Sequence, residues 1–210
     1  MYKTEIIKPG ALHFENLTLN NWTLFENLMG EKGGCGGCWC MSFRLPSTEF
    51  KQNKYDGNKK KLKQLVASGK PVGLLAVYKT EAIGWIALSP REDLLKIEKS
   101  RSLKRIDDKP VWSVSCFFVK KEFRNKGISR LLLKGAIDYA RQQNIQTLEA
   151  YPAIPYAEKI PAPFLWTGVL STFTESGFTI VQKNGNSKAM VRMEVMSLRS
   201  IAGSREPGNK

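Results

Sequence analysis

The sequence predicts an α/β or α+β fold in one domain. Short apolar segments typical of strands are interspersed with segments of helical spacing, and one strand–helix–strand crossover spans residues 111–151. The chain has 210 residues, of which 42% are hydrophobic and 25% charged, which is ordinary globular composition. We expect one domain over residues 1–199 and a disordered tail over residues 200–210.

The first third of the chain predicts one clear helix. Apolar residues recur at intervals of three and four over residues 20–30, and Gly30 ends the pattern. A glycine-rich loop, GEKGGCGGC, then runs into WCMSFR. Residues 51–63 are rich in lysine and are expected to begin as a loop. Helical spacing resumes at Leu62 and ends at Gly69.

The middle of the chain predicts the sheet and the main helix. Residues 72–78 and 82–88 form a probable hairpin around a short turn, and residues 91–108 are charged and irregular to helical. Residues 111–119 are a strongly apolar strand. Residues 128–143 carry the clearest amphipathic helix of the chain, with an apolar stripe on one side.

The last third predicts further strands. A strand is expected over residues 146–151, followed by a proline-rich loop and a short helix at about 167–176. A final hairpin joins residues 178–182 to residues 189–195 through an Asn-Gly turn.

The net charge of the chain indicates which classes of partner it could bind. Thirty-three lysines and arginines against 19 acidic residues give a net charge of +14, which favours a polyanion such as nucleic acid, an anionic membrane or a phosphorylated cofactor. RNA-binding and zinc-finger signatures are missing, so nucleic acid is not the expected partner. We expect no membrane association, because no run of 18 uncharged apolar residues exists. The N-terminal sequence lacks the apolar core of a signal peptide, so the cytoplasm is the expected location.

The turn after the strand at 111–119 predicts an anion site. Its sequence, Arg124-Asn125-Lys126-Gly127-Ile128-Ser129, opens the main helix. A helix N-terminus offers unpaired N–H groups and a positive dipole end, and glycine allows close approach. The prediction is a pyrophosphate cradle. The alternative is a plain strand–turn–helix joint with solvated basic residues.

These residues resemble motif A of the GNAT acyltransferase superfamily. The motif, Q/R-x-x-G-x-G/A, matches Arg124-x-x-Gly127-x-Ser129, with serine at the last small position. The hairpin at 72–88 and the segment FTESGFTIV resemble further elements of that fold, so the likeness covers roughly residues 71–195. The segments CWCMSFR, GWIALSPRED and VWSVSCFFV together resemble a bacterial subgroup of GNAT proteins.

The resemblance implies both a fold and an activity. The implied fold is a GNAT-type single mixed, mostly antiparallel sheet with helices on both faces and a cofactor-binding core at 111–151. The implied activity is an acetyl-CoA-dependent N-acetyltransferase that moves the acetyl group directly to a primary amine, with acetyl-CoA as co-substrate and no metal. The implied cofactor-binding residues are Phe117, Phe118 and Val119 for the pantetheine arm and Arg124, Asn125, Lys126, Gly127, Ile128 and Ser129 for the pyrophosphate.

The catalytic residues are less well indicated. The tyrosine that protonates the leaving thiol in many GNAT enzymes is replaced by Phe173. Tyr151, Tyr156, Cys116 or solvent could substitute, but for each of these side chains a packing or hydrogen-bonding role is the favoured alternative. Glu149 is the candidate base, because a carboxylate inside an apolar strand is unusual unless it is functional or paired. The alternative for Glu149 is an ion pair with arginine or lysine.

The acceptor is not identified by the sequence. The resemblance makes Trp39, Arg44, Trp85 and Arg91 candidates for binding it, and an ion pair is the alternative for Arg91. The alternative function is a non-catalytic module of the same fold that binds acyl-CoA or nucleic acid. A sheet edge near residues 178–195 could pair with a second copy, giving a homodimer.

Three of the four cysteines crowd together. Cys35, Cys38 and Cys40 are compatible with a metal or redox site, with a reactive thiol, or with a loop held by small residues. Structural zinc takes four ligands and only three are local, so no metal is expected.

Overall fold

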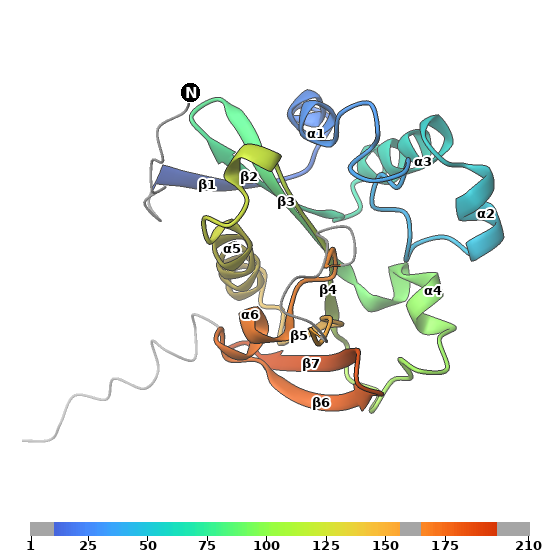
Figure 1. Cartoon of the computed structure of the whole chain (residues 1–210), viewed down its shortest axis with the longest axis vertical. Helices are drawn as coiled ribbons and strands as arrows, with labels where there is room; N and C mark the ends of the chain where they lie inside the picture. The colour runs from blue at the N-terminus through green and yellow to red at the C-terminus, as the bar shows by residue number, and fades with distance from the viewer. Residues whose placement is uncertain (1–10, 156–164, 197–210) are drawn as a thin grey trace, which may run out of the picture.

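The computed structural model describes residues 11–155 and 165–196, and the expected tail at 200–210 lies outside them. The described residues form a seven-stranded sheet in the order β1-β2-β3-β4-β5-β7-β6 (Figure 1). Neighbouring strands are antiparallel except β4 and β5, which are parallel. The mixed, mostly antiparallel sheet expected from the sequence is confirmed. The strands are β1 (Leu12–Asn16), β2 (Gly73–Tyr78), β3 (Glu81–Pro90), β4 (Trp112–Val119), β5 (Thr147–Ala150), β6 (Thr179–Asn184) and β7 (Lys188–Glu194).

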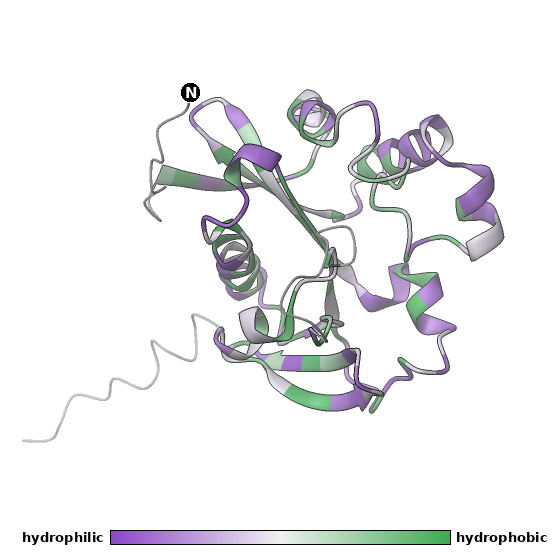
Figure 2. Ribbon diagram, in the orientation of Figure 1, coloured by the Kyte–Doolittle hydropathy of each residue, from purple (hydrophilic) through white to green (hydrophobic). Residues whose placement is uncertain are grey.

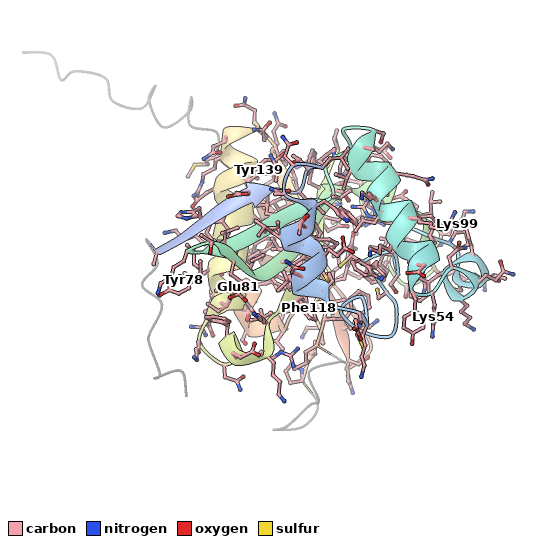
Figure 3. The ribbon with its side chains drawn as sticks, turned by 90° about the horizontal axis from the view of Figure 1, so that it is seen from above. Lys54, Tyr78, Glu81, Lys99, Phe118 and Tyr139 are labelled. Atoms are coloured by element: carbon pink, nitrogen blue, oxygen red, sulfur yellow. The ribbon has the colours of Figure 1, made fainter. Side chains whose placement is uncertain are left out.

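Helices cover both faces of the sheet. Helix α5 lies on one face, while α1 and α3 lie on the other, as the two views show (Figures 1 and 3). Two apolar clusters correspond to these two layers: one contains the buried side of α5, and the other contains the buried sides of α1 and α3. The helices are α1 (Trp22–Met29), α2 (Ser47–Gln52), α3 (Asp56–Ala67), α4 (Leu95–Glu98), α5 (Ile128–Gln142) and α6 (Leu170–Thr174).

The segment at residues 51–63, expected to begin as a loop, is mostly helical: α2 ends at Gln52, a turn follows at residues 53–55, and α3 begins at Asp56. Helix α2 buries none of its residues, and α3 buries only Asn58, Leu62 and Val66. Figure 2 shows α3 mostly in the hydrophilic colour. An apolar stripe this narrow gives little helical periodicity. The many lysines on the solvent side made the segment resemble a polar loop.

The parallel pairing of β4 and β5 is short, and this positions the site. Only Trp112–Val114 pair with Leu148–Ala150, whereas β4 continues to Val119. The ladder between β3 and β4 also shifts register just beyond Val114, as at a β-bulge. The outer edge of β4 therefore separates from β5 in its second half.

Helix α5 packs closely against β1 through a glycine. A Cβ added at Gly135 would lie 2.5 Å from the Phe14 ring, well inside contact distance. Alanine normally stabilises a helix by about 0.5–1 kcal/mol relative to glycine. Here we expect Gly135→Ala to destabilise the protein by about 1–2 kcal/mol, because overpacking costs more than the helix gains. Urea unfolding measures this difference, and a more stable variant would contradict the close packing.

Candidate functional site

The structure contains a cavity of about 600 Å³ beside the second half of β4. A volume of this size is typical of sites for small molecules and cofactors. Most of its lining comes from four segments: the second half of β4, the turn at 124–129 with the first residues of α5, the loop after α1, and residues 165–172. Phe50 of α2 also lines it. In Figure 3, Phe118 of β4 lies beside the loop that follows α1.

The turn before α5 presents backbone N–H groups to this cavity. Gly127 caps the helix with φ at 75°, a left-handed conformation that favours glycine. Within residues 11–155 and 165–196, the N–H groups of Ile128 and Ser129 have no acceptor. A Cβ added at Gly127 would meet nothing within 4 Å, so the space in front of the turn is open. The turn is shaped to receive an anion.

Basic side chains flank the turn. The Arg124 Nε donates a hydrogen bond to the Val119 carbonyl at 3.0 Å, and its guanidinium lies 6.0 Å from the Phe118 ring. The Lys126 ammonium lies 5.7 Å from the Phe123 ring. Of the cofactor-binding residues expected from the sequence, all line the cavity except Lys126.

The β4 edge is partly occupied by the chain itself. Phe117, Phe118 and Val119 all line the cavity, as expected for residues along an extended ligand. The Phe117 N–H, however, already donates to the Trp166 carbonyl at 2.6 Å. This group is therefore not free in the structure, and a ligand would have to displace residue 166 to use it.

All four cysteines line the same cavity. The Cys40 and Cys116 sulfurs lie 3.5 Å apart, and the Trp85 indole N–H donates to the Cys40 sulfur at 3.0 Å. Burial raises the pKa of the Cys38 thiol to about 12. In the described part of the chain, no group of three or more histidine, cysteine or acidic side chains is placed to hold a metal ion.

Glu149 lies in a buried cluster of charges. Tyr151 OH donates to one carboxylate oxygen at 2.7 Å, and Arg91 donates to the same oxygen. Arg192 Nε donates to the other at 2.7 Å. Burial and the neighbouring Glu149 raise the pKa of the Tyr151 phenol well above its usual value. The ion pair that the sequence left open for Glu149 is thus present, and neither Glu149 nor Tyr151 lines the cavity. The role of Glu149 as base stays a prediction.

The family follows from a sequence comparison. The model of the acetyltransferase (GNAT) family matches residues 40–160, more than half of the chain. The chain belongs to this GNAT family. No curated protein sequence matches it.

Solved GNAT structures share the fold. A GNAT-family acetyltransferase from Streptococcus agalactiae is 10% identical, with a TM-score of 0.54, and the match covers 89% of this chain and 96% of that one. One from Listeria monocytogenes is 11% identical, with a TM-score of 0.51 and coverage of 87% and 94%. The PaiA N-acetyltransferase of Thermoplasma acidophilum, solved in complex with coenzyme A, is 15% identical, with a TM-score of 0.50 and coverage of 87% and 98%. At these identities the comparison shows the fold.

The position of the missing GNAT tyrosine lies in the core. Phe173 is fully buried, and its ring centre lies 5.8 Å from that of Phe117 and 5.2 Å from that of Phe178. It fills space between β4 and the last hairpin. Of the suggested substitutes for the tyrosine, Cys116 lines the cavity and Tyr156 lies outside the described residues.

The structure does not support contact with an acceptor for the four residues that the GNAT resemblance suggested. Trp39, Arg44, Trp85 and Arg91 are each at most 4% exposed, and none lines the cavity. The two tryptophans pack around Phe25, and Arg91 belongs to the Glu149 cluster. The resemblance to GNAT proteins suggested binding, but in the structure these four side chains are buried.

Sequence reasoning missed one wall of the cavity. Leu165, Trp166, Gly168, Val169 and Thr172 line it, yet none was singled out. Their position depends on tertiary contacts between this segment and β4. The sequence of the segment alone does not indicate such contacts. The proline-rich loop before it was the only local hint.

Proposed function

We propose that this GNAT-family acetyltransferase binds acetyl-CoA in the cavity and transfers the acetyl group to a primary amine. One observation carries the proposal: the N–H groups at the start of α5 are unpaired and open onto a cavity that continues along the β4 edge. The turn suits the pyrophosphate, and the edge of β4 suits the extended pantetheine arm. The nitrogen acceptor is supported by the resemblance and by the N-acetyltransferase activity named for the Thermoplasma acidophilum fold relative.

Different residues have different roles in the proposed reaction. The turn at 125–129 and Arg124 neutralise the phosphates, and the net charge of +14 draws the anionic co-substrate toward the protein. Binding aligns the thioester with the amine, which is most of what such a transfer needs. In the simplest route, which the resemblance implies, the amine attacks the thioester directly.

A specific observation favours the alternative of a non-catalytic acyl-CoA-binding module. Phe173 replaces the tyrosine that usually acts as the acid and is fully buried. The candidate base Glu149 accepts hydrogen bonds from two arginines. Such a module would bind acetyl-CoA without turnover. Measuring both binding and turnover separates the two functions.

Titration calorimetry with acetyl-CoA, in parallel with free CoA, tests the proposal. We expect saturable binding near micromolar affinity, roughly −8 kcal/mol. Affinity should fall as salt rises, because exposed charges contribute to the site. A panel of primary amines, with chromatographic detection of the acetylated product, then tests turnover. Failure of both CoA species to bind would overturn the proposal, and binding without turnover on any amine would favour the module.

A further inference from the structure

Two cysteine sulfurs meet at the wall of the cavity. Cys40 comes from the loop after α1 and Cys116 from β4, and their sulfurs are 3.5 Å apart. Trp39 and Cys40 have φ angles of 43° and 53°, which residues other than glycine rarely adopt. Such strain persists only where the surrounding structure imposes it, and it concentrates at functional sites. These two residues stand where the loop brings Cys40 to Cys116.

The surroundings of Cys40 favour a negative charge on its sulfur. The Trp85 indole N–H donates to it at 3.0 Å, and the Cys116 sulfur lies 3.5 Å from it. Arg44 is 4% exposed, and its Nη2 reaches only the Val72 carbonyl, at 3.4 Å. Among the described residues, its Nη1 has no hydrogen-bond partner. Burial lowers the pKa of Arg44, while the charge of Asp93 and, to a smaller extent, that of Cys40 raise it.

The directions in which the pKa values of the two thiols shift agree with this geometry. Hydrogen bonds from Cys116 and Trp85, together with the charge of Arg44, lower the pKa of Cys40 despite its burial. The hydrogen bond to Cys40 and burial raise the pKa of Cys116 well above its usual value. These opposite shifts favour Cys40 over Cys116 as the thiol that ionises first.

The pair lies where the acyl end of the co-substrate is expected. The proposed pyrophosphate cradle at 125–129 follows the C-terminal end of β4. A ligand running back along the edge from Val119 passes Phe118 and Phe117 and reaches Cys116 after three residues, roughly 10 Å. Phe117, Phe118, Cys116 and Cys40 line one continuous cavity.

We propose that Cys40 is a nucleophile that takes the acetyl group from acetyl-CoA and then passes it to the amine. This inference rests on the proposed function, since acetyl-CoA must first bind. It replaces the direct attack implied by the resemblance with two transfers through acetyl-Cys40. Thiolates are the strongest nucleophiles among ordinary side chains, and thioester exchange between two thiols is nearly balanced in energy.

Each step balances. The Cys40 thiolate attacks the carbonyl carbon of the thioester, so a C–S bond to Cys40 forms and the C–S bond to CoA breaks. The electron pair leaves on the CoA sulfur, which takes the proton of Cys116. In the second step the amine nitrogen attacks acetyl-Cys40, the C–S bond breaks, and the electron pair returns to Cys40. The proton released from nitrogen goes back to Cys116.

Exchange of the acetyl group between acetyl-CoA and isotopically labelled CoA, without any amine, tests the proposal on the unmodified protein. An acetyl-enzyme makes labelled acetyl-CoA at a rate proportional to enzyme, whereas direct transfer makes none. Rapid acid quench followed by peptide mapping should place one acetyl group on Cys40. With an amine present, initial rates should give the parallel double-reciprocal lines of a two-step mechanism.

Variants distinguish this inference from the proposed function. Cys40→Ser should lose exchange to the rate without enzyme yet still bind acetyl-CoA in calorimetry, which also shows that it is folded. Ser68→Ala, at an exposed position that does not line the cavity, should retain both exchange and the adduct. Exchange that persists in Cys40→Ser, or turnover of an amine by the wild type without exchange, would overturn the inference alone. Loss of acetyl-CoA binding by the wild type would overturn the proposed function and this inference together.

Discussion

Replacing Gly127 by tryptophan is expected to lower the affinity for acetyl-CoA at least about 100-fold, or about 2.7 kcal/mol. Gly127 lines the cavity, and a Cβ there would meet nothing within 4 Å, so an indole at this position is expected to enter the space of the pyrophosphate. It would both fill that space and keep the phosphates from the N–H groups of Ile128 and Ser129. Calorimetry on the folded variant measures the change.

The chain offers a matched control for the strain of this substitution. Gly185, in the turn between β6 and β7, also has a left-handed φ, of 61°, and also meets nothing within 4 Å. A side chain in this conformation costs about 1–2 kcal/mol at either position. Gly185→Trp should therefore lose similar stability but keep its affinity, because this turn does not line the cavity. Unchanged affinity in a folded Gly127→Trp variant would show that the turn is not the anion site.

Replacing Glu149 by glutamine is expected to lower the free energy of unfolding by about 3 kcal/mol, because it leaves two buried guanidiniums facing an uncharged group. The carboxylate is fully buried, with both oxygens held by Arg91, Arg192 and Tyr151. Urea unfolding measures the loss. The remaining partners, Glu98 of Arg91 and Asp107 of Arg192, lie nearer the surface and compensate only in part.

Glu98→Gln is the matched control for this change. It also removes a carboxylate from Arg91, but its side chain is 28% exposed and solvent screens the pair. Its cost should be about 1 kcal/mol or less. A stable Glu149→Gln protein that loses turnover while still binding acetyl-CoA would instead indicate that Glu149 is the base. Equal small losses for both variants would contradict the stabilising role of the buried cluster.

The sequence predicted the sheet and the crossover because both have strong local signals. Strand β4 is a continuous apolar run, α5 has a broad apolar stripe, and the turn between them combines glycine with basic residues. The turn was predicted as an anion site from these local signals, whereas the cavity residues of β4 were implied by the resemblance to GNAT proteins. Strand β1, which was not predicted, has only five residues and pairs by one edge with β2, so its signal is short.

The burial of the four residues suggested for the acceptor could not be predicted, because burial depends on tertiary packing. Trp39 and Trp85 look like binding residues when read along the chain, but they pack around Phe25 from separate elements. The contact between Cys40 and Cys116 joins residues 76 positions apart. Only the folded chain shows that these sulfurs meet and that Arg44 is left without a bonded carboxylate.

The hydrogen bond from Phe117 to the Trp166 carbonyl bears on how the protein responds to its own product. A ligand that takes the Phe117 N–H only exchanges one hydrogen bond for another, so that contact adds little net affinity. Affinity then comes mainly from the phosphate end, which acetyl-CoA and CoA have in common. The two should bind with similar strength. Accumulating CoA would then compete with fresh acetyl-CoA, so the rate of acetylation would follow the ratio of the two in solution rather than the amount of acetyl-CoA alone.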